Sequence, residues 1–561
     1  MAALSLPEAK MTPDLIVTNA RVLTMDASNP RAEAVVMTAG KIAFVGARRD
    51  AEAMAGSSTH MIDARGRTVV PGFVESHLHL VLGGAELAHL QIGGVQGFEA
   101  LRDAFRTFAA KHPDRPLLMA QGADYAMMDH PMTRADLDAM LPDRPIAITA
   151  ADHHTVWANT AALKAAGILH GLETPHGHEV VIGDDGLATG ELREFEAFAP
   201  LIALGGEARL NLGIATGGEP SPWPSDAERA IDRAKVVMGL RHCAAHGITS
   251  MVNMDGNLYT LTLLKEIQAA GDLLARVKVP FHFKPHMDFS ELARAEQITR
   301  DFNDDWLSSG FVKMFMDGVM DSGTAFMLTD YPDAPGHRSE ALFSHARFCE
   351  IATEIDRRGL QIAVHAIGDA AVRQTIDGFE AAQKANGKRD SRHRIEHIEL
   401  IDPADVSRLG ALGITASLQP PHPPAAMDFP MFPTMNKIAK ERWKDAYTWN
   451  TLAKAGATVV FASDWPVSDV SVLRGIKAAR TRKPYPSACD ERLGLMETLH
   501  AYTAGGAWAA HREHVTGKLR SGLAADLVML GFNLEKTQAE MFDQQSIALT
   551  ICGGRITHEA T

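Results

Sequence analysis

The sequence predicts an α/β fold, and two observations indicate it. Short β-branched runs alternate with segments of helical periodicity, such as 227–245 and 348–358, and this alternation is typical of parallel β/α units. Polar side chains of metal-ligand type also fall at the ends of several runs, where barrel enzymes assemble their sites. The predicted strands are 68–74, 146–149, 249–252, 311–316, 361–365, 394–398, 415–417 and 458–462.

The two ends of the chain are expected to form β-hairpins instead. Two β runs flank a Thr38-Ala39-Gly40 turn near the N-terminus, and two more flank Gly553-Gly554 near the C-terminus. We therefore expect a small composite β-sandwich from residues 1–68 and 512–561, joined to an α/β body at 69–511.

The first predicted strands of the body lie too far apart for simple β/α units. An insertion is therefore expected at about 85–224. Its loops around 171–190 and 205–224 are rich in glycine, proline and histidine, and long loops of this kind often serve as functional lids.

Composition excludes several classes of protein. The formal net charge is -14, and no Lys/Arg stripe of the kind found in nucleic-acid binders is present, so a nucleic-acid partner is not expected. No stretch reaches the apolar length of a membrane helix, and residues 1–11 lack the pattern of a signal peptide. We expect a cytoplasmic protein with no membrane partner. The four cysteines are unpatterned and predict neither disulfides nor a metal site.

A His77-x-His79 pair follows the apolar run 68–74 directly. Side chains two residues apart on a strand point to the same face, about 7 Å apart along it. Both imidazoles can therefore converge on one metal ion.

Four further side chains strengthen this interpretation when taken together: Lys313, His365, His397 and Asp464, each inside or just after a short β-branched run. Each has an ordinary explanation alone, because a lone histidine is more often a core or surface residue and an aspartate before a proline can cap a turn. A lysine in the apolar surroundings of Lys313 is rare unless it is paired or modified. All of them in order, at strand ends, predict a metal-dependent hydrolase.

Longer motifs resemble a known family. This pattern resembles the amidohydrolase superfamily, and its flanking residues resemble the YtcJ-like branch, amidohydrolase family 3, which includes N-substituted formamide deformylases. The resemblance extends over essentially the whole chain. The matching stretches are 70–79, 152–159, 190–194, 312–318, 365–369 and 517–526.

The resemblance implies a (β/α)8 TIM-like barrel that carries the composite sandwich and the insertion. It also implies two divalent ions, and imidazole and carboxylate ligands suit zinc best. His77, His79 and Asp464 would hold the first ion, and His365 and His397 the second.

Lys313 would bridge the two ions after carboxylation by CO2. A protonated ammonium cannot bind a cation, whereas a carbamate offers two oxygens and a negative charge. A site with one ion remains an alternative, as do manganese, iron and cobalt.

The expected activity is hydrolysis of a non-peptide C–N bond in an amide, formamide, cyclic amide or carbamate. A metal-bound hydroxide would attack the carbonyl, with Asp464 as general base and then general acid. His154 is a second catalytic candidate, which would stabilise an oxyanion or orient the substrate, unless it only caps the following helix.

Three alternatives share this sequence pattern. A lactone or ester hydrolase would use the same hydroxide. A heterocycle deaminase is disfavoured by Lys313, and a non-catalytic scaffold is disfavoured because every ligand position is filled. Met and aromatic residues in the loops predict a small-molecule substrate with an apolar group. The sequence places no arginine clearly enough to predict a carboxylate-binding site, although Arg193 is a candidate. A homo-oligomer is possible.

Overall fold

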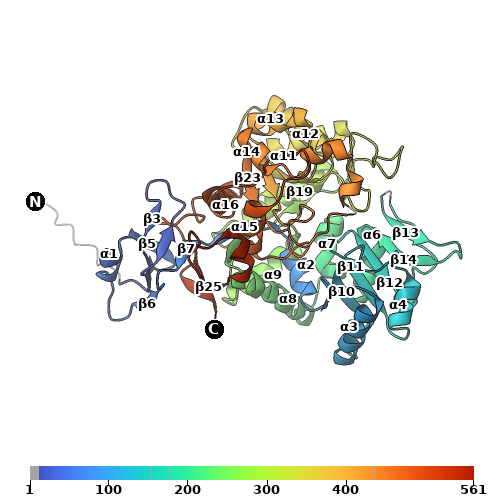
Figure 1. Ribbon diagram of the computed structural model, residues 1–561, viewed down its shortest axis with the longest axis horizontal. Helices are drawn as coiled ribbons and strands as arrows, with labels where there is room; N and C mark the ends of the chain where they lie inside the picture. The colour runs from blue at the N-terminus through green and yellow to red at the C-terminus, as the bar shows by residue number, and fades with distance from the viewer. Residues whose placement is uncertain (1–11, 152, 176, 433, 561) are drawn as a thin grey trace, which may run out of the picture.

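The computed structural model describes residues 12–151, 153–175, 177–432 and 434–560. The first eleven residues of the predicted 1–68 segment therefore lie outside the described part, as does Thr561. Figure 1 shows three regions: sheets made from both chain ends on one side, a barrel in the middle, and the insertion on the opposite side. Among the described residues, every helix is too short or too polar to cross a membrane.

The central region forms the α/β barrel. Its strands pair in parallel, with Lys313 opposite Ala363 and Ala366 opposite His397. Most of their residues are buried, as expected when helices cover the outside of a parallel sheet. In chain order the strands are β8 (Phe73–Leu78), β15 (Ile248–Asn253), β16 (Arg276–Lys278), β19 (Phe311–Phe315), β20 (Gln361–Ala366), β21 (Arg394–His397), β22 (Thr415–Leu418) and β23 (Thr458–Phe461).

Helices follow these strands and cover the outside of the barrel. One of them, α13, shows why they begin and end where they do. Asp402 caps its first turn, Pro403 occupies its first position, and Gly413 closes it in the left-handed conformation. The main helices are α8 (Asp226–Ala245), α9 (Leu258–Ala269), α10 (Leu292–Asp301), α11 (His345–Arg357), α12 (Asp369–Asn386), α13 (Pro403–Leu412), α14 (Trp449–Lys454) and α15 (Val472–Thr481).

Hydrogen bonds group the barrel strands into two sheets, which the chain joins between β16 and β17 (Phe281–His282) and which contact each other at β8 and β23. β16 lies in one sheet, and the chain then continues into β17, which pairs with β19 in the other. At the second meeting point the backbone N–H of Asp464 donates to the carbonyl of His77 at 2.9 Å. The sequence analysis missed β16 and β17 because Pro280 interrupts their short run.

Strands from both ends of the chain form two further sheets with a common core. β24 (Leu527–Leu530) pairs antiparallel with β7 (Thr68–Pro71). One sheet has the order β5 (Lys41–Gly46), β4 (Ala34–Thr38), β1 (Leu15–Thr18), β6 (His60–Asp63). The other has the order β26 (Arg555–Glu559), β25 (Ile547–Cys552), β24, β7, β2 (Arg21–Leu23), β3 (Arg31–Ala32). A buried ion pair of 2.7 Å between Asp526 and Arg276 of β16 ties this region to the barrel. The boundaries at 68 and 512 stay predictions.

The predicted strand 68–74 is in fact two strands. β7 belongs to the terminal sheet, and β8 begins the barrel after Gly72. A side chain at Gly72 would collide with Thr249, so the close approach of β15 requires glycine at this junction.

The insertion has its own six-stranded sheet. The predicted strand 146–149 is present as β11 (Ile146–Ala150), but it lies in this sheet and not in the barrel. Its neighbours are β10 (Leu118–Ala123) and β12 (Thr155–Ala158). The helices α6 (Phe195–Leu204) and α7 (Ala208–Thr216) follow the sheet in the chain.

Candidate metal centre

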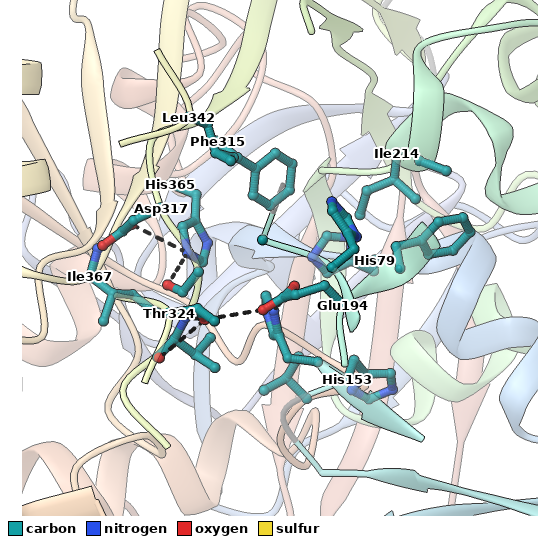
Figure 2. A pocket seen from close by; sticks show the side chains of 18 of the residues that line it. His79, His153, Glu194, Ile214, Phe315, Asp317, Thr324, Leu342, His365 and Ile367 are labelled. Carbon is teal, nitrogen blue, oxygen red and sulfur yellow. Dashed lines mark hydrogen bonds and ion pairs between the residues drawn. The ribbon is translucent and has the colours of Figure 1, made fainter. Parts of the chain in front are cut away.

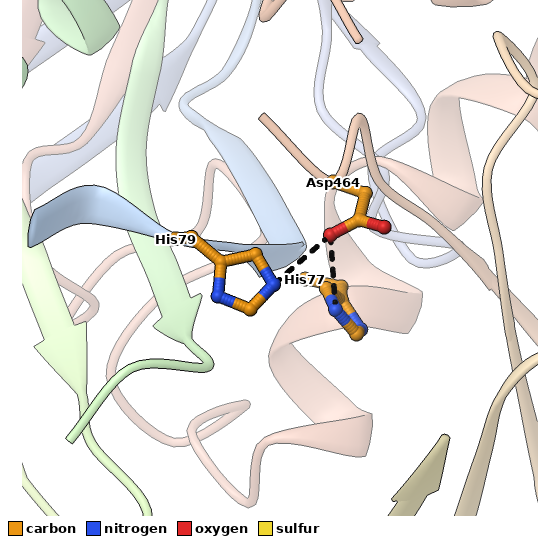
Figure 3. Close-up of side chains that lie close together, drawn as sticks. All are labelled: His77, His79 and Asp464. Carbon is orange, nitrogen blue, oxygen red and sulfur yellow. Dashed lines mark ion pairs between the residues drawn. The ribbon is translucent and has the colours of Figure 1, made fainter. Parts of the chain in front are cut away.

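Two histidines and a carboxylate meet at the junction of β8 and β23 (Figure 3). His77 lies in β8, His79 directly follows it, and Asp464 follows β23. Nε2 of each histidine lies 3.2 Å from Oδ1 of Asp464. The three side chains are buried, and Asp464 has a φ of 62°, a strained backbone conformation that is found most often at functional sites.

The other ring nitrogen of each histidine is fixed by a buried carboxylate. Nδ1 of His77 lies 2.7 Å from Glu396 of β21, and Nδ1 of His79 lies 2.6 Å from Asp255 after β15. A carboxylate can only accept a hydrogen bond when ionised, so each Nδ1 carries the hydrogen. In the neutral histidine Nε2 then bears a lone pair that faces Asp464.

This arrangement calls for positive charge at its centre. Two nitrogen lone pairs and a carboxylate oxygen would repel one another without a proton or a cation between them. Burial by itself lowers the pKa of His79, but Asp255 and Asp464 raise it to about 9. Burial opposes ionisation of Asp464, yet His77 and His79 hold its pKa well below the ordinary value. The donor set therefore fits a divalent cation.

The predicted ligands His365 and His397 lie beside this cluster. Their ring centres are 4.5 Å apart, and the His397 ring is 4.9 Å from that of His77. Nε2 of His365 donates to the carbonyl of Gly318 and Nδ1 of His397 to Oε1 of Gln419, each at 3.0 Å. Nδ1 of His365 and Nε2 of His397 therefore keep their lone pairs.

Lys313 is buried in β19 and lines the same cavity. Its Nζ has no hydrogen-bond partner within the described part of the chain and lies 4.2 Å from the centre of the Phe315 ring. Burial lowers the pKa of Lys313 to about 8, although Glu396 and Asp464 act in the opposite direction. A larger share of neutral amine makes this nitrogen a better nucleophile.

His422 is a further buried group beside Asp464. Its Nδ1 lies 3.4 Å from Glu399, its Nε2 lies 3.8 Å from Asp464, and its ring stacks on that of His397. His397, His422 and Asp464 form a second set of possible ligand atoms within 4.8 Å of one another. Because His422 is held in a loop after β22, no spacing pattern could have revealed it.

The insertion contributes His154 to the same cavity. Nδ1 of His154 lies 2.7 Å from Glu194, and its ring centre is 6.2 Å from that of His365. Glu194 also accepts a 3.0 Å hydrogen bond from Thr324 in the loop after β19 (Figure 2). The neighbouring His153 pairs with Glu86 instead, at 2.9 Å.

These groups line one cavity of about 710 Å³ between the barrel and the insertion. Its metal-ligand end is polar. Elsewhere its wall is largely apolar, with Phe315 and Leu342 from the barrel and Phe195, Phe198 and Ile214 from the insertion. Figure 2 shows Ile214 and Phe315 on facing sides. The cavity can therefore hold a small molecule with an apolar group next to the polar end.

Comparison with known proteins agrees with the fold. Residues 60–558 match the model of the amidohydrolase family. The putative amidohydrolase YtcJ of Bacillus subtilis is 27% identical, with 96% of this chain and 98% of the relative covered. The N-substituted formamide deformylase of Arthrobacter pascens is 26% identical, with 92% and 93% covered. An uncharacterised metal-dependent hydrolase from Pyrococcus horikoshii has a TM-score of 0.71 at 22% identity, with 94% and 98% covered.

The family match and these relatives show a metal-dependent hydrolase. The match over most of its length shows that the chain belongs to the amidohydrolase family. The fold class, the family resemblance and the enzyme class that the sequence predicts are thereby confirmed.

Proposed function

We propose that the enzyme hydrolyses a non-peptide C–N bond in a small amide, formamide, cyclic amide or carbamate, at a centre of two zinc ions. The observation that carries this proposal is the bonding of the four histidines. Each uses one ring nitrogen on a protein acceptor, so that the other keeps its lone pair for an ion. Glu396, Asp255, Gly318 and Gln419 provide these acceptors.

In this proposal His77, His79 and Asp464 hold one ion, and His365 and His397 hold the other. Lys313 joins the two sites as a carbamate. Its neutral amine adds to the carbon of CO2, one N–H proton leaves to solvent, and the product carries two oxygens and a negative charge. The buried Nζ, which has no hydrogen-bond partner among the described residues, supports this modification.

The residues have distinct parts in the proposed reaction. Bound divalent ions would supply an acidified water, whose pKa falls from near 16 to about 7, and would polarise a carbonyl. Asp464 would take the proton of the attacking water and return it to the leaving nitrogen. His154, whose Nδ1 is held by Glu194, would in its doubly protonated form donate an Nε2–H hydrogen bond to the substrate carbonyl oxygen, where negative charge develops.

The formamide deformylase among the relatives supports C–N hydrolysis over the ester alternative. Cytoplasmic location and oligomeric state stay predictions of the sequence.

The first test is the metal content of the protein purified without chelator and with bicarbonate present. We expect about two zinc ions per chain in the wild type, and loss of metal in Lys313→Ala, because the bridging ligand is removed. Lys235→Ala is the matched control, since Lys235 forms an ion pair with Glu207 at 2.8 Å and should keep the full metal content. Wild-type protein that takes up no metal on reconstitution would refute the proposal.

Bond specificity is tested with a matched pair of substrates, N-(2-phenylethyl)formamide and 2-phenylethyl formate. The proposal expects the formamide to be hydrolysed by the zinc-loaded enzyme. Hydrolysis of the ester alone would make the enzyme an esterase and contradict the assignment to C–N bonds.

A further inference from the structure

Lys284 is a second lysine on the wall of the cavity. It follows β17, and part of its surface stays open to the cavity that it lines. Its Nζ donates to the backbone carbonyl of Ile214 in α7 of the insertion and lies 5.0 Å from the centre of the Phe315 ring. Lys284 therefore lies where the barrel meets the insertion.

Among the described residues, Lys284 lacks the counterion that other basic residues of the chain have. Within the described part of the chain, no carboxylate oxygen lies within 4.0 Å of its Nζ. By contrast, Lys235 pairs with Glu207, and Arg193 pairs with both Glu179 and Glu191. Burial and the charge of Lys313 lower the pKa of Lys284 to about 7, although Glu196 opposes this shift. An anion in the cavity would supply the missing charge.

The position of Phe315 relates Lys284 to the metal-ligand end. The Nζ atoms of Lys313 and Lys284 lie 4.2 and 5.0 Å from the centre of the same ring, so their separation cannot exceed the sum of these distances. A substrate that reaches from the metal ligands to Lys284 thus needs only a short spacer between its reacting carbonyl and its anionic group.

Apolar side chains lie beside Lys284, namely Ile214 and Phe315. Phe283 also lines the cavity, as do the polar Glu196 and His286. The sequence analysis considers Arg193 for carboxylate binding, but Arg193 is bound to two glutamates and does not line the cavity. Of the described residues, the lysines that line the cavity are Lys284 and Lys313, and no arginine does so.

We propose that Lys284 binds a carboxylate of the substrate. The preferred substrates are then N-acyl amino acids with a free carboxylate and an apolar side chain. This inference takes the cleaved bond from the proposed C–N hydrolysis. It takes the recognition of the carboxylate from the position of Lys284. In such a substrate the carboxylate lies a few bonds from the amide carbonyl, and the side chain meets the apolar wall.

Binding tests the recognition without the reaction. Calorimetry on the zinc-loaded enzyme compares 3-phenylpropionate with 3-phenylpropan-1-ol, which differ only in the charged end. We expect the carboxylate to bind the wild type at least about tenfold more tightly than the alcohol, a modest effect for a charge-assisted hydrogen bond. Lys284→Gln should abolish this preference, and Lys284→Arg should keep most of it.

Arg193→Gln is the matched control, because it removes a cation that lies outside the cavity, and it should keep the preference. Equal affinity of wild type and Lys284→Gln for 3-phenylpropionate would overturn the proposal, since the carboxylate would then be held by the metal ligands or elsewhere. Failure of the wild type to bind 3-phenylpropionate would overturn it as well.

Turnover separates this inference from the proposed function. N-formylphenylalanine and N-(2-phenylethyl)formamide share the scissile bond and differ in the carboxylate. Lys284→Gln should raise KM for the first at least about tenfold and leave KM for the second unchanged. Carboxylate binding that depends on Lys284, with hydrolysis of neither compound, would contradict C–N hydrolysis and still support the anion site.

Discussion

The two walls of the cavity hold their polar side chains in different ways. On the barrel wall, His77 and His79 are buried, and each is fixed by a buried carboxylate: Glu396 within β21 and Asp255 just after β15. On the insertion wall, His154 and Glu194 are half-buried and flank β12 and β14 (Ala188–Arg193). A rigid wall suits the binding of ions, and a wall of loops suits the binding of different substrates.

The difference between the two walls predicts which property a substitution in each wall should change. Changes on the barrel wall should alter metal content or abolish turnover. Changes on the insertion wall should leave the metal in place and alter rate or selectivity.

The largest effect is expected for Asp464→Asn. The substitution removes the proposed proton carrier and weakens an ion ligand, so kcat should fall by about 10³-fold or more while the circular dichroism spectrum stays that of a folded protein. Asp469→Asn is the matched control, because Asp469 pairs with Arg474 at 2.6 Å and does not line the cavity. Near wild-type turnover of Asp464→Asn would remove Asp464 from the mechanism.

A smaller effect is expected for Asp255→Asn. This substitution changes the hydrogen-bond partner of His79 and replaces none of the proposed metal ligands. An amide holds the Nδ1 hydrogen less firmly than a carboxylate, so zinc affinity should fall about 10–100-fold. Competition with a chelator measures this, and Asp490→Asn serves as control because Asp490 pairs with Arg492 on the surface. Unchanged zinc affinity would mean that the orientation of His79 does not depend on Asp255.

The sequence predicts the barrel wall better than the insertion wall. Strands in an apolar run place their side chains by a period of two, so His77-x-His79 and the ends of β19, β20 and β21 could be found from the sequence. The sequence also indicates that Glu396 is paired, because a carboxylate in the buried run of β21 needs a partner. The assignment of these residues as ligands stays a prediction, although the structure brings them together.

The residues that sequence analysis missed or could not place lie mostly in loops. Packing of segments that are distant in the sequence brings three residues to the cavity: Lys284, His422 and Glu399. No local sequence pattern predicts that packing. The sequence indicated His154 through its motif, but its partner Glu194 is forty positions away. The strand β16 was missed as well, because Pro280 shortens the apolar run that contains it.

The smallest of these effects tests the insertion wall through Glu194→Gln. Glu194 contacts His154 and Thr324, so its proposed part is to position His154. The substitution should lower kcat about tenfold, less than loss of a hydrogen-bond donor to an oxyanion, and zinc content should stay at the wild-type level. Loss of zinc would mean that Glu194 supports metal binding as the barrel-wall residues do. The proposed difference between the two walls would then be wrong.

A double-mutant cycle separates positioning from a general structural effect. If Glu194 acts through His154, then Glu194→Gln should have no further effect on kcat in a His154→Gln background. Additive losses would mean that the two residues act independently, with Glu194 serving mainly to tie the insertion to the loop that carries Thr324. In that case the two walls would be coupled by packing alone, and selectivity would depend on Lys284 and the apolar wall instead of His154.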